Sequence, residues 1–353
     1  MKYYKPRGVS KSYIVLVTLR HLYTNYGGLV GSLTHRIERI SYDDAGGIMT
    51  KSKWFKGNLH THTTESDGDS DPDVVASWYA KHGYQFLVLT DHNHLTLLET
   101  PTDKRVDWPL LIPGEEVTLV LKSGTVPVHL NAIGIKHVVE PVDADDVVAT
   151  LQANINAIRE AGGMAEINHP GFKFAIDSDH LRQITGAHFL EIYNGNPLSN
   201  NLGVGGNVSP EGMWDTMLSE GRPIFGVAVD DAHHFTEEFN TSRSNPGRGW
   251  IVVSSSECSR EAILDSLDRG AFYASTGINL LELEVTSSGL RVVVDTDDLL
   301  AYSTFFIGSN GTVLAESLVE ESVYELDNSD KYVRAVVQAS DGSRAWTQPV
   351  FAS

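Results

Sequence analysis

The stretch WFKGNLHTHTTESDG, residues 54–68, is the starting point for predicting fold and site, because it joins a short apolar strand to a pair of histidines. Residues 54–59 predict the strand, and His60 and His62 stand at its end. On an extended chain, side chains two residues apart point to the same side. The pair can therefore bind one metal ion or two adjacent ions. An H-x-H pair alone is a weak signal, so its meaning depends on the residues around it.

Beyond this stretch, short apolar runs alternate with helical stretches as far as about residue 277. The predicted strands cover residues 86–90, 128–135, 165–168, 189–193 and 224–229, and the predicted helices cover residues 71–81, 143–161, 209–220 and 259–269. Asp71-Pro72 and Ser209-Pro210 are typical helix starts. Strands that alternate with helices indicate an α/β fold built on a parallel sheet or barrel.

Histidines and acidic residues recur at the ends of the predicted strands and are almost absent within them. These groups are Asp67, Asp91-His92, Glu115-Glu116, His129, His169, Asp230-Asp231 and His233-His234. In parallel α/β barrels, polar groups at the carboxyl ends of the strands converge on one face, where the chemistry takes place. A structural role is the simpler interpretation of any single histidine, but the recurrence at strand ends indicates a metal site.

The same motifs, in the same order, resemble the PHP family, named for polymerase and histidinol phosphatase domains. They are HTHTTESDG (60–68), LTDHN (89–93), IPGEE (112–116), His129, INHPG (167–171), EIYNG (191–195) and DDAH (230–233), within residues 54–277. The resemblance implies an α/β fold, a distorted seven-stranded β/α barrel, that binds two or three divalent ions of Zn, Mn or Fe. The implied metal ligands are His60, His62, Asp67, His92, Glu116, His129, His169, Asp231 and His233.

The resemblance also implies roles for some of these residues. Glu116 is expected to bridge two ions, with Glu115 as the alternative, and Asp231 is expected to hold the first ion and orient a metal-bridging hydroxide. Asp67, His92 and His233 are expected to hold a third ion. Asp230 and His234 are further catalytic candidates, either as general acids or as supports of the ligands. Candidate substrate-binding residues on loops are Lys173, Asn194, Arg243 and Arg248.

The motifs GRGWIVV (247–253), AFYASTG (271–277) and AWTQPVF (345–351) resemble a branch of small PHP hydrolases with a C-terminal β domain. That branch is similar to carbaryl-hydrolase-like metallohydrolases as well as to phosphoesterases. The first interpretation is therefore a phosphoesterase that cleaves a small phosphate mono- or diester. The alternative is a hydrolase of carboxylic or carbamate esters with the same metal centre. A third interpretation is a non-catalytic metal-binding protein.

Two flanking segments differ from the expected barrel. Residues 1–50 carry seven basic and three acidic side chains, so we expect a basic, loosely ordered extension. The alternative is that this segment is not native and that Met49, after Ala45-Gly46-Gly47-Ile48, is the true first residue. Residues 278–353 alternate short apolar runs with turn residues, which predicts a small C-terminal antiparallel β-sandwich.

The composition limits the classes of substrate and partner that we expect for this protein. The formal net charge of −19 repels phosphate backbones, which speaks against a nucleic-acid polymer and leaves a small-molecule ester as the expected substrate. Cys258 is the single cysteine, which excludes an internal disulfide and a thiolate-rich metal site. No apolar run reaches the roughly 18 residues of a membrane span, and no convincing signal peptide is present, so a cytoplasmic location is expected. The oligomeric state is left open.

Overall fold

The computed structural model describes residues 52–98, 108–122, 124–236 and 239–352. The chain divides into two compact units, Met1–Lys53 and Trp54–Ser353, and the second unit contains the candidate site. The expectations about a basic extension over residues 1–50 and about a start at Met49 lie outside the described residues. None of the described helices combines the length and apolar character that crossing a bilayer requires.

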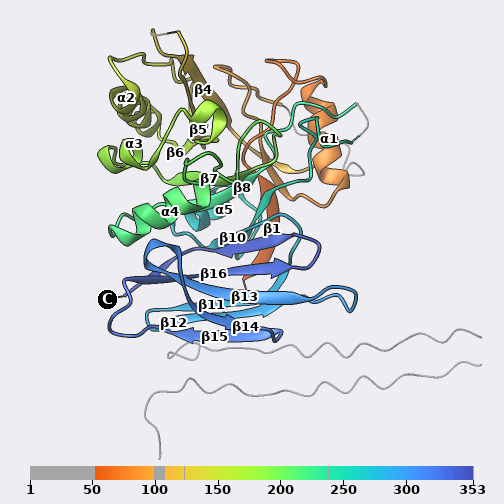
Figure 1. Ribbon diagram of the computed structural model, residues 1–353. Helices are drawn as coiled ribbons and strands as arrows, with labels where there is room; N and C mark the ends of the chain where they lie inside the picture. Colours follow the sequence, from red (N-terminus) through yellow and green to blue (C-terminus); the bar gives the residue numbers. More distant parts are fainter. Residues whose placement is uncertain (1–51, 99–107, 123, 237–238, 353) are drawn as a thin grey trace, which may run out of the picture. The chain divides into compact units, whose positions relative to one another are not determined.

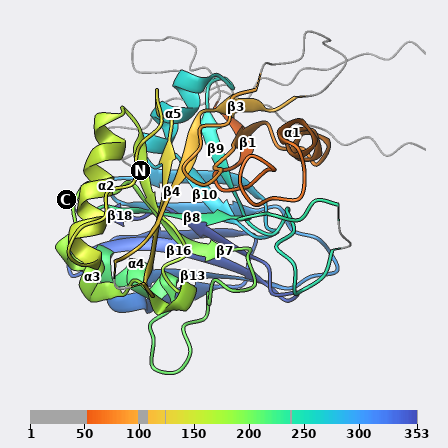
Figure 2. The same ribbon diagram turned by 90° about the horizontal axis from the view of Figure 1, so that it is seen from above.

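The described helices match those predicted between residues 54 and 277, with one addition. They are α1 (Pro72–Lys81), α2 (Val147–Glu160), α3 (Ser178–Gln183), α4 (Pro210–Ser219) and α5 (Arg260–Asp268). Helix α2 starts four residues later than predicted, because the carboxylate of Asp146 caps it by accepting a hydrogen bond from the Ala149 amide. The short helix α3 escaped the sequence analysis. Figure 2 shows α2 and α3 along one side of the strands and α1 on the opposite side.

Ten of the described strands precede residue 278. They are β1 (Lys53–Asn58), β2 (Phe86–Val88), β3 (Leu110–Ile112), β4 (Gly114–Val120), β5 (Pro127–Ile133), β6 (Met164–Ile167), β7 (Phe189–Asn194), β8 (Phe225–Val229), β9 (Trp250–Ser255) and β10 (Phe272–Ser275). Strands β4 to β8 form one sheet in chain order, in which β6, β7 and β8 are parallel and β5 is antiparallel to both of its neighbours. Strands β1, β2 and β3 are parallel in a second sheet.

The mixed α/β class is confirmed, whereas a closed seven-stranded barrel is not. Among the described strands, the two sheets are joined only by single parallel bridges between Thr61 and Ala232 and between His92 and Glu116. Each bridge involves or adjoins a predicted metal ligand. The two sheets therefore approach each other at the end that carries the histidines, but no continuous ladder of hydrogen bonds closes them into a barrel.

Eight more described strands follow, and they either extend the second sheet or form a separate one. They are β11 (Leu280–Thr286), β12 (Gly289–Val294), β13 (Tyr302–Gly308), β14 (Thr312–Ser317), β15 (Glu321–Glu325), β16 (Tyr332–Ala339), β17 (Arg344–Thr347) and β18 (Val350–Phe351). Strand β17 pairs with β10, so one sheet runs from β14 through β13, β16, β17, β10 and β9 to β1 (Figure 1). Strands β11, β12 and β15 form a separate antiparallel sheet. The domain boundary expected at residues 277 and 278 falls between β10 and β11 and remains a prediction.

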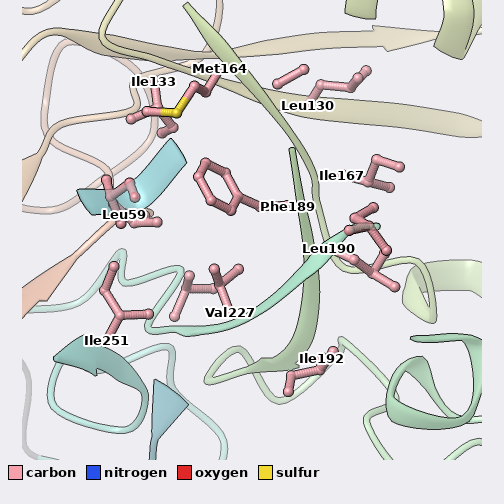
Figure 3. Packing of buried hydrophobic residues seen from close by; sticks show 14 of the residues in the cluster. Leu59, Leu130, Ile133, Met164, Ile167, Phe189, Leu190, Ile192, Val227 and Ile251 are labelled. Atoms are coloured by element: carbon pink, nitrogen blue, oxygen red, sulfur yellow. The ribbon is translucent and has the colours of Figure 1, made fainter. Parts of the chain in front are cut away.

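The main core fixes the ends of the strands that carry the polar groups. Leu59, Ile167 and Val229 are fully buried, and each directly precedes a polar residue of the candidate site or its surroundings. Figure 3 shows Leu59 and Ile167 in the same cluster as Phe189 and Val227. Burying one such side chain stabilises the fold by about 1.5–3 kcal/mol. This core therefore anchors the backbone from which the histidines and carboxylates project.

Candidate metal centre

Four side chains converge on a first point. The His60 Nε2 atom lies 3.3 Å from Asp231 Oδ1 and 3.6 Å from Glu116 Oε2. The His62 Nε2 atom lies 3.3 Å from Asp231 Oδ1, 3.4 Å from Glu116 Oε2 and 3.1 Å from His60 Nε2. A tetrahedral ion with ligand distances of about 2.1 Å separates its ligand atoms by about 3.4 Å. The side chains of this first cluster therefore fit one divalent ion.

A second cluster uses the other oxygen of the same glutamate. Glu116 Oε1 lies 2.9 Å from His129 Nδ1 and 3.3 Å from His169 Nε2. Glu116 thus presents one oxygen to each cluster, which is the arrangement of a bridging carboxylate. The neighbouring Glu115 is on the opposite side of β4, where its Oε1 accepts a hydrogen bond from the Val139 amide. Of the two glutamates considered, only Glu116 faces both clusters.

His129 reaches the second cluster because β5 is antiparallel to both of its neighbouring strands. Leu130 of β5 pairs with Ile167 at the carboxyl end of β6. The start of β5 therefore lies beside the carboxyl end of β6, and His129 meets His169 there although the two residues sit at opposite ends of their strands. Their rings are 5.0 Å apart and nearly perpendicular. An all-parallel sheet would place His129 at the far edge.

A third cluster gathers around Asp67. Its Oδ1 atom lies 3.3 Å from His233 Nε2, 3.5 Å from His92 Nε2 and 3.6 Å from His62 Nδ1. The side chain of Asp67 is 55% exposed, in contrast to the buried Glu116, so this cluster opens toward solvent. Its four residues can hold a metal ion together. The three clusters bring together all nine residues that the sequence resemblance implied as ligands.

Two of the predicted ligands have a left-handed backbone conformation, which is consistent with a functional site. Asp231 has φ = 48° and His169 has φ = 23°, which for residues other than glycine costs about 1–3 kcal/mol each. Both are held by hydrogen bonds: the Asp231 amide donates to the His60 carbonyl, and the His169 amide donates to Glu191 Oε2 at 2.6 Å. Such strain persists only where the surroundings over-determine it, which is typical of functional sites.

Two buried carboxylates behind the predicted ligands, Glu191 and Asp91, were given no role by the sequence analysis. Glu191 Oε1 lies 2.6 Å from His60 Nδ1, and Glu191 Oε2 also accepts from Asn194 Nδ2. This contact directs the Nε2 atom of His60 toward the first cluster. Asp91 accepts hydrogen bonds from the Thr63 amide and hydroxyl and from Ser66 Oγ, which shapes the turn that carries Asp67. An acid inside the apolar strand FLEIYN was the available signal for Glu191.

Burial and charge compete at the ligands. Burial favours the neutral imidazole of His60, but the carboxylates of Asp231, Glu191 and Glu116 outweigh it and raise the pKa well above its ordinary value. For His62, burial together with the charge of His233 lowers the pKa to about 4. Burial raises the pKa of Asp231, but the nearby histidines, His60 first, reverse the shift and hold it below its usual range. The carboxylates therefore stay ionised and attract cations.

The three clusters open into a pocket of about 230 Å³. Phe172 and Leu198 supply its apolar wall, and Asn196 and Ser199 supply neutral polar groups. Neither lysine nor arginine is among the described residues that line it. Positive charge in this pocket can therefore come from its histidines or from bound cations.

The other predicted site residues lie around this pocket in different ways. Asn194 donates to Asp231 Oδ2 at 3.2 Å and so supports a ligand. Asp230 is turned away, because its carboxylate accepts hydrogen bonds from Tyr79 Oη and from the amides of Arg248 and Gly249. This placement favours a role in holding those loops. The pocket lining contains Asn196 and Ser199, which were not predicted.

Four further predicted residues, His234, Lys173, Arg243 and Arg248, also lie outside the described lining of the pocket. The ring of His234 is 6.4 Å from that of His233. Lys173 is exposed, with its Nζ 5.4 Å from the centre of the Phe172 ring. The backbone amide of Arg243 donates to the Asn240 carbonyl. The guanidinium of Arg248 donates to the carbonyls of Gly195 and Asn240.

No family model and no curated protein matches the chain. Similar solved structures include a two-domain protein from Bacteroides vulgatus that contains a predicted PHP-like metal-dependent phosphoesterase (16% identity, TM-score 0.48, 90% of this chain and 100% of that chain). They also include an amidohydrolase from Chromobacterium violaceum (17%, 0.33, 53% and 93%) and a lesion-specific endonuclease from Pyrococcus furiosus (12%, 0.37, 62% and 56%). The first is described as PHP-like, in agreement with the family that the sequence motifs resemble. With TM-scores below 0.5, these likenesses carry no conclusion about function.

Proposed function

We propose that this chain is a metal-dependent hydrolase and, within that class, a phosphoesterase that cleaves a small phosphate mono- or diester. The observation that supports it most is Glu116, which offers one oxygen to His60 and His62 and the other to His129 and His169. A buried carboxylate between two histidine clusters is costly unless cations accompany it. The same arrangement suits a pair of divalent ions that share one ligand.

The residues divide among three ions. His60, His62, Asp231 and Glu116 would hold the first, Glu116, His129 and His169 the second, and Asp67, His92 and His233 the third. Imidazole and carboxylate ligands without thiolate suit Zn, Mn or Fe. When bound, such ions lower the pKa of water and neutralise charge on the oxygens of the substrate.

The protein's own groups would position the reactants. Asp231 stays ionised and is oriented through Oδ2 by Asn194, so its carboxylate can accept a hydrogen bond from the attacking water. Glu191 fixes the ring of His60, and Asp91 fixes the turn before Asp67. Phe172 and Leu198 would keep bulk water away from the reacting bond.

The third cluster favours a phosphoryl group over a carbonyl. A phosphoryl group has several oxygens that can each face a cation, whereas an ester carbonyl develops charge on one oxygen. Since the described pocket lining contains neither lysine nor arginine, a third cation is the available source of further positive charge. A carboxylic or carbamate ester remains the second candidate, supported by the apolar contacts that Phe172 and Leu198 offer.

The test is elemental analysis of the purified chain together with turnover on matched substrates. The substrates are phosphate monoesters, phosphate diesters, aryl carboxylic esters and aryl carbamates, each assayed before and after chelation. We expect two to three equivalents of Zn, Mn or Fe and phosphate release that chelation abolishes. Activity that persists in metal-free protein would refute the metallohydrolase, and turnover limited to aryl esters or carbamates would replace the phosphoesterase with the second candidate.

A further inference from the structure

A larger cavity adjoins the metal pocket. This side cavity, of about 700 Å³, lies between the β7–α4 loop (residues 195–209), residues 239–241 and Arg248. Asn196 and Ser199 line both the metal pocket and the side cavity. The metal pocket, at about 230 Å³, is smaller than the roughly 300–1,000 Å³ of typical ligand sites. Ions and a phosphoryl group would fill it, so the alcohol part of an ester must extend elsewhere.

The side cavity carries a cation that has no counter-ion among the described residues. The guanidinium of Arg248 donates to Gly195 O at 3.0 Å, to Asn240 O at 2.6 Å and to Asn245 Oδ1 at 3.2 Å. All of these acceptors are neutral, and Arg248 has no carboxylate partner among the described residues. Because a guanidinium has five N–H donors, two remain for a ligand. The nearby carboxylate of Asp230 is fully buried and binds the backbone amide of Arg248 instead.

The rest of the lining agrees with an anionic or oxygen-rich ligand. The described residues around the side cavity include no aspartate or glutamate. The Nδ2 group of Asn196 has no hydrogen-bond partner among the described residues, while its Oδ1 accepts from the Leu198 amide. A free amide donor therefore stands where the metal pocket and the side cavity meet. The guanidinium of Arg248 donates a hydrogen bond to the carbonyl of Gly195, which directly follows Asn194 in the sequence. Asn194 in turn contacts Asp231.

We infer that the side cavity binds the alcohol part of the ester and that Arg248 selects an alcohol bearing an anionic group, such as a carboxylate or a second phosphate. This inference rests on the proposed phosphoesterase function. A cation held only by neutral oxygens attracts an anion more strongly than one already neutralised by a carboxylate. Asn196 would donate to the ester oxygen or its neighbour at the junction. Specificity would then come from the side cavity, and reactivity from the metal centre.

The experiment compares two substrates that differ in one group. The metal-loaded full chain is assayed on 3-phosphoglycerate, which carries a carboxylate, and on glycerol 3-phosphate, which carries a hydroxyl group there. We expect kcat/KM to favour the carboxylate by about 10- to 100-fold, the range of one or two charge-assisted hydrogen bonds. Arg248→Gln should reduce this ratio to near one. Arg248→Lys, which keeps the charge but not the full set of bonds, should retain most of it.

Arg222→Gln is the matched control, because Arg222 also donates to backbone carbonyls, those of Leu181, Arg182 and Ile184, but lies outside the lining of both cavities. It should leave the ratio unchanged. Calorimetric binding of glycerate and glycerol gives a readout that needs no turnover, and only glycerate binding should weaken in Arg248→Gln. If both substrates and both alcohols behave alike in the unmodified chain, or if Arg248→Gln changes neither preference, the inference is wrong. Absence of any phosphate ester cleavage would refute the proposed function separately, while glycerate binding would still decide the role of Arg248.

Discussion

The negative charge of two buried carboxylates in this chain, Asp215 and Glu116, is compensated in different ways. Between α4 and β16, Asp215 receives two hydrogen bonds from Arg334, at 2.8 and 2.7 Å, and a third from Tyr332 Oη. Arg334 is 1% exposed, and a permanent cation is thus built into the fold. At the candidate site, Glu116 is equally buried but is surrounded by histidines, which can lose their protons. In the cluster around Asp215 the cation is a side chain of the fold, whereas the cluster around Glu116 is suited to metal ions that bind reversibly.

This difference distinguishes a carboxylate that stabilises the fold from a carboxylate that is suited to metal binding. A carboxylate paired with arginine is satisfied at any moderate pH, because the guanidinium does not deprotonate. A carboxylate among imidazoles, which can lose their protons to a metal ion, is suited to metal binding, since imidazole nitrogen and carboxylate oxygen are both ligands. If this distinction is right, substitutions at the two clusters should change different properties of the protein.

The largest expected effect is at the bridging position. Glu116→Gln should lose bound metal and reduce kcat by about 10³-fold or more, because a neutral amide bridges two dications poorly. Metal content by elemental analysis and turnover on phosphate esters measure the change. Glu115→Gln, on the same strand but facing Val139, is the control and should do much less. The opposite ranking would show that the wrong glutamate is assigned as the bridge.

The structural cluster should respond in stability instead. Arg334→Met leaves Asp215 buried without its cation and should lower the free energy of unfolding by about 3–5 kcal/mol, as measured by urea denaturation. The double variant Arg334→Met with Asp215→Leu should recover most of the loss, since it removes both charges. Metal content should stay the same in each folded variant. Metal loss in Arg334→Met would mean that the two clusters are not independent.

A smaller effect is expected at the exposed third cluster. Asp67→Asn should reduce turnover on phosphate esters by about 10- to 100-fold while leaving two ions bound, because the clusters around Glu116 do not use this side chain. Metal analysis and kcat on phosphate and aryl esters are measured together. If phosphate turnover survives while one ion is lost, a three-ion clamp on the phosphoryl group is excluded and the ester or carbamate hydrolase gains support.

The smallest effect concerns Lys56, a half-buried cation outside both clusters. Burial lowers the pKa of Lys56 from 10.5 to about 8, against the attraction of Asp230. Between these two pH values the unfolded chain binds a proton that the folded chain has released, so the free energy of unfolding should rise with pH. Lys56→Met should flatten this rise between pH 8 and about 9.5 in denaturation experiments. Lys122→Met, at an exposed side chain, should leave the slope unchanged.

Much of the candidate site could be predicted, because its residues stand in short motifs of the sequence. His60 and His62 stand two residues apart just after β1, and the other predicted ligands stand near strand ends or in adjacent turns. Ligand type and position along a strand depend on a few neighbouring residues. All nine residues implied by the resemblance are found in the three clusters. The alternation of strands and helices likewise predicted the mixed α/β class.

Only the tertiary structure decided how those residues face one another. The antiparallel course of β5 brings His129 to His169, and the two oxygens of Glu116 point to different clusters. Asp230 and Asp231 are adjacent in sequence, yet the left-handed backbone at Asp231 turns one toward the metal centre and the other toward Tyr79. Strand pairing, like these contacts, joins residues that are distant in sequence. No local pattern specifies it, because its free energy comes from surfaces that meet only after folding.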